Sequence, residues 1–340
     1  MELLILGGTA WLGRALAADA VRRGHRVICL ARGEAGDVAD GAELVVADRS
    51  RADAYDAVAG RHWDAVVDVT RHPGFARRAA AALAGRAAHW TFVSSGNVYA
   101  RHDEPGADES AELLPPLDAD ESTPETYGEA KSAIEHAYRE ALDGRLLIVR
   151  PGLIGGPGDA SGRSGYYVAR AARDDEPMLV PAIADAAAQL IDVRDLVTWM
   201  LDSIEHGLSG AFDAVGVRST VGAYVAASRA VGGHRGESVE APGAWLAEQG
   251  VAEWSGPESL PLWIADPAWA AFQDRSNAAA VRAGLRLRPL EETLADLLEW
   301  ERVEGLTRDR GAGLTASRER ELVASFLART DLLDRATPRR

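Results

Sequence analysis

Six short apolar runs, each separated from the next by helical or turn sequence, constrain what the first 150 residues can fold into. The runs are almost continuously apolar, as in strands that a sheet buries on both faces. Strands and helices in alternation predict a doubly wound parallel α/β sheet with helices on both sides. The predicted strands are residues 2–7, 26–31, 42–47, 64–69, 89–94 and 145–150, and the clearest predicted helices are 12–23, 75–86 and 127–142.

The pattern changes after Pro151, where a Gly-rich stretch and then a Trp-rich segment follow. A strand and helix at about 189–205 and one more strand at 210–217 still fit the sheet. We therefore predict a first domain of residues 1–152 plus about 189–217. A smaller lobe, with a charged C-terminal helix, is predicted from about 153–188 plus 218–340.

Composition narrows the class of function. The chain has 340 residues and a net charge of −15, which disfavours binding to nucleic acid or to an anionic membrane. Its one cysteine, Cys29, allows no disulfide framework and no cysteine-based zinc site, and no metal site is predicted. No signal peptide and no apolar run of about 20 residues is found, so a cytoplasmic protein is expected.

A Gly-rich turn joins the first predicted strand to the first predicted helix in "LLILGGTAWLG". Gly7, Ala10 and Gly13 are spaced three apart, so the middle glycine of a dinucleotide-binding fingerprint is replaced by alanine. Such a turn lets the backbone approach a pyrophosphate, whose charge then meets the N-terminus of the helix. The sequence therefore predicts a dinucleotide cofactor here.

Residues after the second and third strands bear on the choice of cofactor. A free ribose 2′-hydroxyl calls for an acid at the end of the second strand, whereas a 2′-phosphate calls for an arginine. Ala31 and Arg32 stand there, which favours NADP(H) over NAD(H), although Arg32 pointing into solvent is the alternative. Asp48 is predicted either to accept from the adenine amino group or to cap a turn.

Several stretches together resemble the extended short-chain dehydrogenase/reductase family, also called the NAD-dependent epimerase/dehydratase family. They are "GGTAWLG", "FVSSGNVYA" (92–100), "YGEAK" (127–131), "RPGLIGGPGD" (150–159) and "QLIDVRDL" (189–196). The resemblance covers roughly residues 1–215 and is closest to a mostly uncharacterised bacterial and plastid branch. It implies a Rossmann-like fold and chemistry that begins with hydride transfer.

The resemblance also assigns catalytic roles. Hydride transfer at a carbon that bears oxygen needs a proton to move on that oxygen, and Tyr127 can move it if a nearby cation lowers its pKa. Lys131 stands one helical turn away and supplies the charge. Ser95, rather than Ser94, is expected to hold the substrate oxygen. A solvated Tyr–Lys pair on a helix surface is the alternative.

The remaining predicted site residues follow from the resemblance and from position in the chain. The acidic segment 101–126 is either a solvated loop or a lid at the mouth of the site. The tyrosines near the start of the second lobe either contact substrate or pack between the lobes. The predicted cofactor residues are Gly7, Thr9, Ala10, Trp11, Leu12, Gly13, Arg32, Asp48, Thr70, Lys131, Pro151 and Leu153, and the predicted substrate residues are Asn97, Arg163, Tyr166 and Tyr167.

Three functions fit these residues. The leading one is an NAD(P)-dependent oxidoreductase that acts on a carbinol or ketone of a small metabolite, with Tyr127 as acid/base. The alternative within the same class is an NAD(P)-dependent epimerase or dehydratase acting on a sugar-like substrate. A non-catalytic cofactor-binding redox sensor is the alternative of another class. A small-molecule substrate is the expected partner, and a homodimer is the protein partnership left open.

Overall fold

The computed structural model describes residues 1–336, and it divides the chain into two compact units. Unit 1 comprises residues 1–153, 191–217 and 274–287, and unit 2 comprises residues 154–190, 218–273 and 288–340. The predicted second lobe extends to residue 340, so its last four residues lie outside the described part. The chain leaves unit 1 within β7 (Leu153–Gly155) and re-enters it within β10 (Leu190–Asp192).

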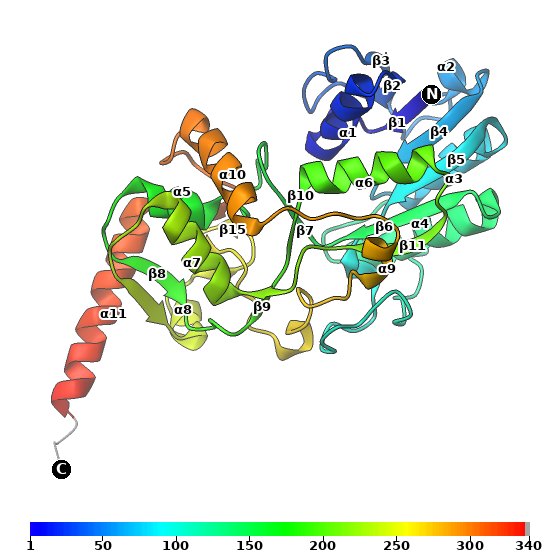
Figure 1. Ribbon diagram of the computed structural model, residues 1–340. Helices are drawn as coiled ribbons and strands as arrows, with labels where there is room; N and C mark the ends of the chain where they lie inside the picture. Colours follow the sequence, from blue (N-terminus) through cyan, green and yellow to red (C-terminus); the bar gives the residue numbers. More distant parts are fainter. Residues whose placement is uncertain (337–340) are drawn as a thin grey trace. The chain divides into compact units, whose positions relative to one another are not determined.

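Unit 1 is built on a seven-stranded sheet in which every paired strand is parallel (Figure 1). Each predicted strand is present within two residues of its predicted start, which confirms the doubly wound α/β fold. The strands are β1 Glu2–Leu6, β2 Arg26–Ala31, β3 Glu43–Val46, β4 Trp63–Asp68, β5 Ala87–Val93, β6 Leu146–Pro151 and β11 Gly210–Ala214.

Helices cover both faces of this sheet. Helices α1 and α6 pack against each other, and α3 and α4 form a second packed pair (Figure 1). The buried core between α3, α4 and the sheet is apolar and includes Trp63, Trp90 and Tyr138. The helical segments of unit 1 are α1 Trp11–Arg22, α2 Asp56–Ala59, α3 Pro73–Leu83, η1 Ala84–Arg86, η2 Gly96–Val98, α4 Tyr127–Leu142, α6 Val193–Glu205 and α9 Ala278–Arg282.

The strand order β11-β6-β5-β4-β1-β2-β3 reverses direction between β1 and β4. Ligands of open parallel sheets bind at such a switch point, outside the carboxyl ends of the strands. In register, Leu6 of β1 lies opposite Asp68 of β4. The turns that follow these two strands therefore leave the same edge of the sheet side by side.

Residues 274–287 belong to unit 1, which corrects the predicted domain boundary. Arg275 Nε donates to the carboxylate of Asp213 at 2.9 Å, and both side chains are buried. Asn277 Nδ2 donates to the carbonyls of Val215 and Gly216. These polar contacts join segments about 60 residues apart, and no local hydrophobic pattern predicts them.

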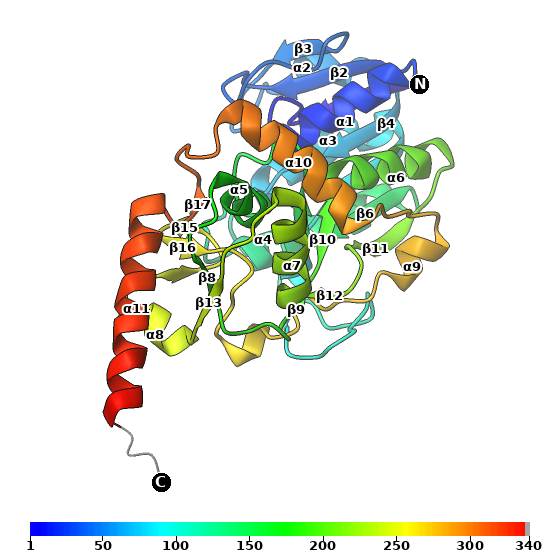
Figure 2. The same ribbon diagram turned by 60° about the vertical axis from the view of Figure 1, so that its left-hand side comes forward.

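Unit 2 holds three mutually packed helices, α5, α7 and α10, and a parallel strand pair, β8 with β13 (Figure 2). Buried carboxylates organise it: Glu319 pairs with Arg170 and Arg173, and Glu301 with Arg308 and Arg310. Its elements are α5 Tyr166–Arg173, β8 Met178–Pro181, β9 Ala187–Ala188, β12 Ser219–Thr220, α7 Val221–Gly232, β13 Ser238–Ala241, α8 Gly243–Glu248, β14 Ala252–Glu253, β15 Gly256–Pro257, β16 Ser259–Leu260, η3 Pro267–Trp269, α10 Leu290–Glu304, β17 Ala312–Gly313 and α11 Ala316–Ala336.

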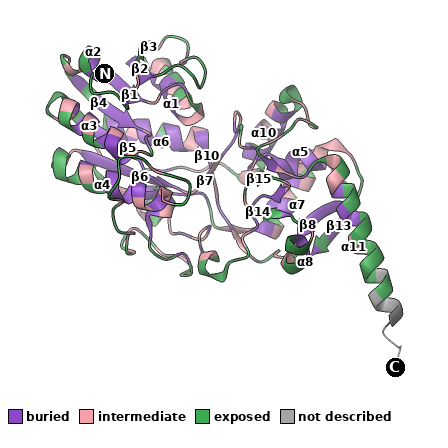
Figure 3. Cartoon of the chain, turned by 180° about the vertical axis from the view of Figure 1, so that it is seen from behind, coloured by how far each residue is buried: buried purple, intermediate pink, exposed green. Residues whose placement is uncertain are grey.

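Burial follows the sequence pattern in both units (Figure 3). The strands of the central sheet are mostly buried, whereas much of α11 is exposed, as expected for a charged surface helix. Of the late tryptophans, Trp245 and Trp263 are buried in unit 2, and Trp254, Trp269 and Trp300 are half-buried. Apolar burial of this kind stabilises a fold in proportion to the area removed from water.

The turn between β1 and α1 depends on a close backbone approach at Gly13. A Cβ atom at this position would lie 2.3 Å from the carbonyl oxygen of Gly7 and 3.0 Å from the Cα of Gly8. Both contacts are with backbone, which cannot rotate out of the way. Gly7 itself has a φ of +110°, a conformation that favours glycine.

We predict that Gly13→Ala destabilises the protein by about 1–3 kcal/mol, because overpacking outweighs the gain in helix propensity. Gly60→Ala is the matched control: its φ is −78° and no atom lies within 4 Å of the added methyl group. The control should be neutral or slightly stabilising. Urea unfolding of both variants measures the difference, and equal free energies of unfolding would contradict the close approach.

Candidate active site

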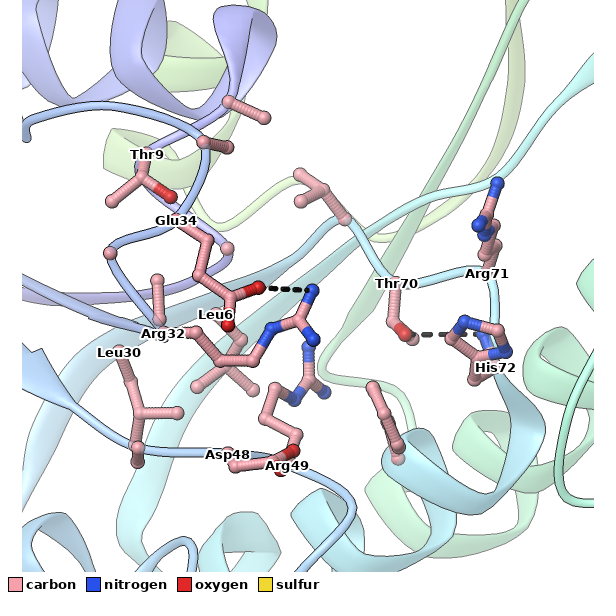
Figure 4. A pocket seen from close by; sticks show the side chains of 18 residues that line it. Leu6, Thr9, Leu30, Arg32, Glu34, Asp48, Arg49, Thr70, Arg71 and His72 are labelled. Atoms are coloured by element: carbon pink, nitrogen blue, oxygen red, sulfur yellow. Dashed lines mark hydrogen bonds and ion pairs between the residues drawn. The ribbon is translucent and has the colours of Figure 1, made fainter.

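A cavity of about 590 Å³ opens at the switch point of the sheet, at the carboxyl ends of β1, β2, β3 and β4 (Figure 4). Six of the predicted cofactor residues line it: Gly7, Thr9, Ala10, Arg32, Asp48 and Thr70. Sequence analysis missed much of the remaining lining, namely Leu6, Leu30, Gly33, Glu34, Ala35, Ala47, Arg49, Val69, Arg71, His72 and Phe75. The signal that could have found them is position, since most stand within a few residues of a strand's carboxyl end.

The other predicted cofactor residues do not line this cavity. Trp11, Leu12 and Gly13 lie on the first turn of α1, where Gly13 serves the close approach described above. Pro151 ends β6 and Leu153 begins β7, and both are buried. A cofactor role for these five residues stays a prediction.

The N-terminus of α1 faces the cavity through Ala10, its N-cap residue. Ala10 is exposed and extended, with φ −82° and ψ 162°, so the backbone there does not require the missing glycine. No side chain caps the helix and its first turn carries no acid. The dipole of the helix therefore favours an anion at this position.

Arg32 forms an ion pair with Glu34, with 3.1 Å between Nη2 and Oε2 (Figure 4). Both side chains are more than 60% exposed, so the pair contributes little stability. The charge of Arg32 also acts on Asp48, whose pKa is lowered first by hydrogen bonds from Ser50 and then by Arg32 and Arg51. Asp48 thus caps its own turn, which was one of its two predicted roles.

Arg49 lines the cavity, but its guanidinium is bonded to side chains beneath it. Its guanidinium donates two hydrogen bonds to the carboxylate of Asp68 and one to Tyr55 Oη. Asp68 is fully buried at the end of β4, and Tyr138 of α4 donates to it as well. A buried carboxylate of this kind persists because its charge is paired and hydrogen-bonded.

Ser95 and Asn97 lie together in the turn that follows β5. Ser95 Oγ donates to Asn97 Oδ1 at 2.9 Å and accepts from the Asn97 backbone N–H at 3.2 Å. The start of α4 packs on this turn so closely that a Cβ on Gly128 would lie 2.4 Å from the Asn97 carbonyl oxygen. The glycine between Tyr127 and Lys131 therefore brings their helix against the serine turn.

Lys131 is buried, with 3% of its surface exposed. Its Nζ donates to the carbonyls of Thr70 and Val93, each at 2.7 Å, and lies 5.8 Å from the ring centre of the half-buried Tyr127. Burial lowers the pKa of the ammonium to about 7, against the attraction of Asp68 and Glu135. The predicted Tyr–Lys pair is therefore no solvated helix edge, and Lys131 reaches the strand end that lines the cavity.

Lys131 is also the only lysine in the sequence, and the other 36 basic residues are arginines. An arginine cannot lose its proton in a protein, whereas a buried lysine shifts its pKa readily. Among the lysine and arginine residues of this chain, Lys131 is therefore the one whose side chain can titrate near neutral pH. This composition signal was available before the structure and was missed.

The acidic segment 101–126 is hydrogen-bonded to unit 1 along its length. Gly106 N donates to Asp274 O, and Leu114 N donates to Val98 O. Glu109 accepts from the Asp213 backbone N–H, and Ser122 N donates to His72 Nδ1, on the cavity lining. These bonds favour a fixed wall over a lid.

The predicted substrate residues of unit 2 are not among those that line the cavity. Tyr166 and Tyr167 begin α5 and are buried, and Tyr167 Oη donates to the Pro261 carbonyl at 3.0 Å. Arg163 lies over the Trp254 ring. Their burial favours packing for the tyrosines, and a substrate role for these three residues stays a prediction.

The residues present fit a dinucleotide cofactor. The cavity offers an open helix N-terminus for a diphosphate, apolar walls from Leu6, Leu30 and Val69, and cations at its rim. Within residues 1–336, no cluster of His, Cys, Asp or Glu is arranged to hold a metal ion. In the same range, every helix is too short or too polar to cross a membrane.

Comparison with solved structures supports the fold. A putative epimerase from Burkholderia cenocepacia J2315 is 23% identical, with a TM-score of 0.69 over 89% of this chain and 98% of the other. The UDP-glucose 4-epimerase of Thermus thermophilus, solved with NAD, is 17% identical, with a TM-score of 0.63 over 89% and 99% of the chains.

The UDP-glucuronic acid 4-epimerase of Bacillus cereus, also solved with NAD, is 12% identical, with a TM-score of 0.63 over 91% and 100% of the chains. At these identities the likeness establishes the fold alone. A search of curated proteins found no match.

The sequence itself matches the NAD dependent epimerase/dehydratase family over residues 3–214, well over half of the chain. This span contains the whole cavity lining, the serine turn and the Tyr127–Lys131 pair. It confirms the resemblance found in the sequence motifs. The chain belongs to the NAD-dependent epimerase/dehydratase family.

Proposed function

We propose that this protein is an NAD(P)-dependent epimerase that acts on a sugar-like substrate by reversible hydride transfer at a carbinol carbon. The observation that carries the proposal is Lys131, buried beside Tyr127 and bonded to the carbonyl of Thr70 on the cavity. This arrangement brings an acid/base pair to the cofactor cavity. The bound dinucleotide would supply the hydride acceptor.

Each residue has a defined task in this chemistry. Tyr127 takes the proton of the substrate hydroxyl and returns it, and the cation at Lys131 favours its phenolate form. Ser95 orients the substrate oxygen, and its own hydroxyl is held by Asn97. Elimination of water would need a further acid, and the residues beside Ser95, Gly96 and Asn97, carry no carboxyl group. We therefore favour an epimerase over a dehydratase.

Family membership and the epimerase neighbours support an epimerase over the oxidoreductase of a carbinol or ketone that leads among the functions predicted from the sequence. A reductase remains the second candidate, because Arg32 at the end of β2 favours NADP(H), a cofactor suited to net reduction. The two differ in what happens to the cofactor. An epimerase returns the hydride to the same substrate, whereas a reductase releases an oxidised cofactor each turnover.

For the cofactor itself we propose NADP(H). The first carboxylate that follows β2 in the chain is Glu34, which is paired with Arg32 in an exposed and weak contact. A 2′-phosphate carries more charge than a carboxylate and can displace it. The NAD found in the structural neighbours is the competing choice.

The first test of function identifies the bound nucleotide and measures whether a deuterium label on the substrate is retained. Denaturing the purified protein should release a bound dinucleotide, and a sugar deuterated at the reacting carbon should keep its deuterium after inversion. Tyr127→Phe should still bind the nucleotide, yet lower turnover by roughly 10²- to 10⁴-fold, since only the acid/base is lost. Stoichiometric oxidation of added NADPH would instead identify a reductase, and wild-type turnover in Tyr127→Phe would refute the mechanism.

The second test concerns the 2′-phosphate. Arg32→Ala should weaken NADPH binding about 10- to 100-fold and leave NADH binding nearly unchanged, because one charge-assisted contact is lost. Glu34→Gln is the matched variant, and it should leave NADPH binding equal or tighter. Titration of both nucleotides by fluorescence measures this. Tighter binding of NADH than of NADPH by the wild type would overturn the proposed preference.

A third test uses the single lysine. Selective ¹³C-lysine labelling gives one Cε signal, whose titration midpoint in the apo protein should lie near pH 7. The same signal in urea should titrate near the ordinary value of about 10.4. Because the folded pKa is the lower one, the folded state binds fewer protons between about pH 7 and 10, and stability contributed by this group rises with pH there. A folded-state midpoint near 10 would contradict the buried amine.

A further inference from the structure

Arg71 is a cation of the cavity that the proposed chemistry has not used. Arg71 follows Thr70 on the turn after β4, is exposed to solvent and lines the cavity. Within residues 1–336 its guanidinium makes no hydrogen bond or ion pair. The other two arginines of the lining are both paired, Arg32 with Glu34 and Arg49 with Asp68.

We propose that Arg71 binds the diphosphate of the dinucleotide cofactor. This inference rests on the proposed function, because it assigns a ligand group of the same cavity. An arginine suits the task, since its planar guanidinium donates two parallel hydrogen bonds to phosphate oxygens.

Strand register relates the turn that carries Arg71 to the turn between β1 and α1. Leu6 and Asp68 lie opposite each other, and Val69 N donates to the Leu6 carbonyl at 3.3 Å. The turn after β4, which carries Arg71, therefore leaves the edge of the sheet beside the turn between β1 and α1. Arg32 follows β2 instead, on the other side of β1. Figure 4 draws Arg71 across the cavity from Arg32, Glu34 and Thr9. A diphosphate at the N-terminus of α1 would thus have the turn of Arg71 on one side, and Arg32, on the other side, would be left for the adenosine ribose.

The turn after β1 gives a diphosphate backbone N–H groups but no cationic side chain. Thr9 is its polar residue within the lining, and Ala10 is its N-cap. The whole chain carries a net charge of −15, which opposes the approach of an anionic cofactor. Arg32 and Arg49 of the same lining are paired with Glu34 and Asp68, so within residues 1–336 Arg71 is the lining arginine whose charge no carboxylate pairs.

The field of Arg71 reaches the groups on both sides of it. Burial lowers the pKa of His72, and the charge of Arg71 lowers it further, against the opposing charge of Glu121. Arg71 also lowers the pKa of Lys131, after the larger effect of burial. Arg71 thus lies close enough to both groups for its charge to act on each of them.

The experiment measures binding of ADP, NADH and NADPH to the full-length protein by calorimetry. All three ligands share the diphosphate, so Arg71→Ala should weaken each of them by a similar factor of about 10 to 100. Arg71→Lys keeps a point charge and should lie between the wild type and Arg71→Ala. Arg26→Ala is the matched control, because it removes an exposed arginine at the amino end of β2, and it should bind as the wild type does.

The outcomes separate the inference from the proposed function. ADP binding to Arg71→Ala within two-fold of the wild type would overturn the inference. A loss confined to NADPH would do the same, because it would make Arg71 a 2′-phosphate ligand. If the wild type bound neither NADH nor NADPH, the proposed function itself would fail.

Discussion

The burial of one ammonium group between two strand ends is the contact on which the candidate site depends. Lys131 Nζ donates to carbonyls at the ends of β4 and β5, so it ties helix α4 to two strands of the sheet. A buried charge costs free energy unless it is paired and hydrogen-bonded. The Lys131 ammonium donates hydrogen bonds to two carbonyls and is attracted by the carboxylates of Asp68 and Glu135. The cost of burying this charge shows as the lowered pKa of the Lys131 ammonium.

The carboxylates that face Lys131 are held by arginines of their own. Asp68 is paired with Arg49, and Glu135 accepts two hydrogen bonds from Arg150. Burial alone would raise the pKa of Glu135, but the bonds from Arg150 bring it below its ordinary value. Removing Arg49 would leave the buried Asp68 without its ion pair, whereas Glu135 would lose Arg150 but keep an ion pair with Arg139.

The same network continues to the serine turn and to the chain segment that returns late. Arg150 donates to Tyr99 Oη, which donates to Asp213, and Asp213 also accepts from Arg275. Tyr99 lies in the same motif as Ser95, and Arg275 stacks on its ring. The turn that carries Ser95 is thus braced by residues from β6, β11 and the 274–287 segment. The hydrogen-bond network around Tyr99 therefore needs residues from all three of these segments.

The sequence by itself determined the architecture and the family. Continuous apolar runs identify strands buried on both faces, because a parallel sheet covered by helices leaves no polar face. The motifs "GGTAWLG" and "YGEAK" identified the turn and the helix, since their spacing is a local property of the chain. That the chain has a single lysine, Lys131, can also be read from the sequence alone.

Tertiary structure alone decided which side chains meet. The cavity lining combines the ends of four strands, and no local pattern shows that Arg71 and His72 line the same cavity as Thr9. The pairing of Arg275 with Asp213 moved residues 274–287 into unit 1, against the prediction from composition. Likewise the burial of Tyr166 and Tyr167 favours packing over substrate contact. The spacing of apolar residues that identifies a strand or a helix can be recognised within a dozen residues of sequence. Which charged side chains pair depends on the order of the strands in the sheet, and that order is fixed only when the chain has folded.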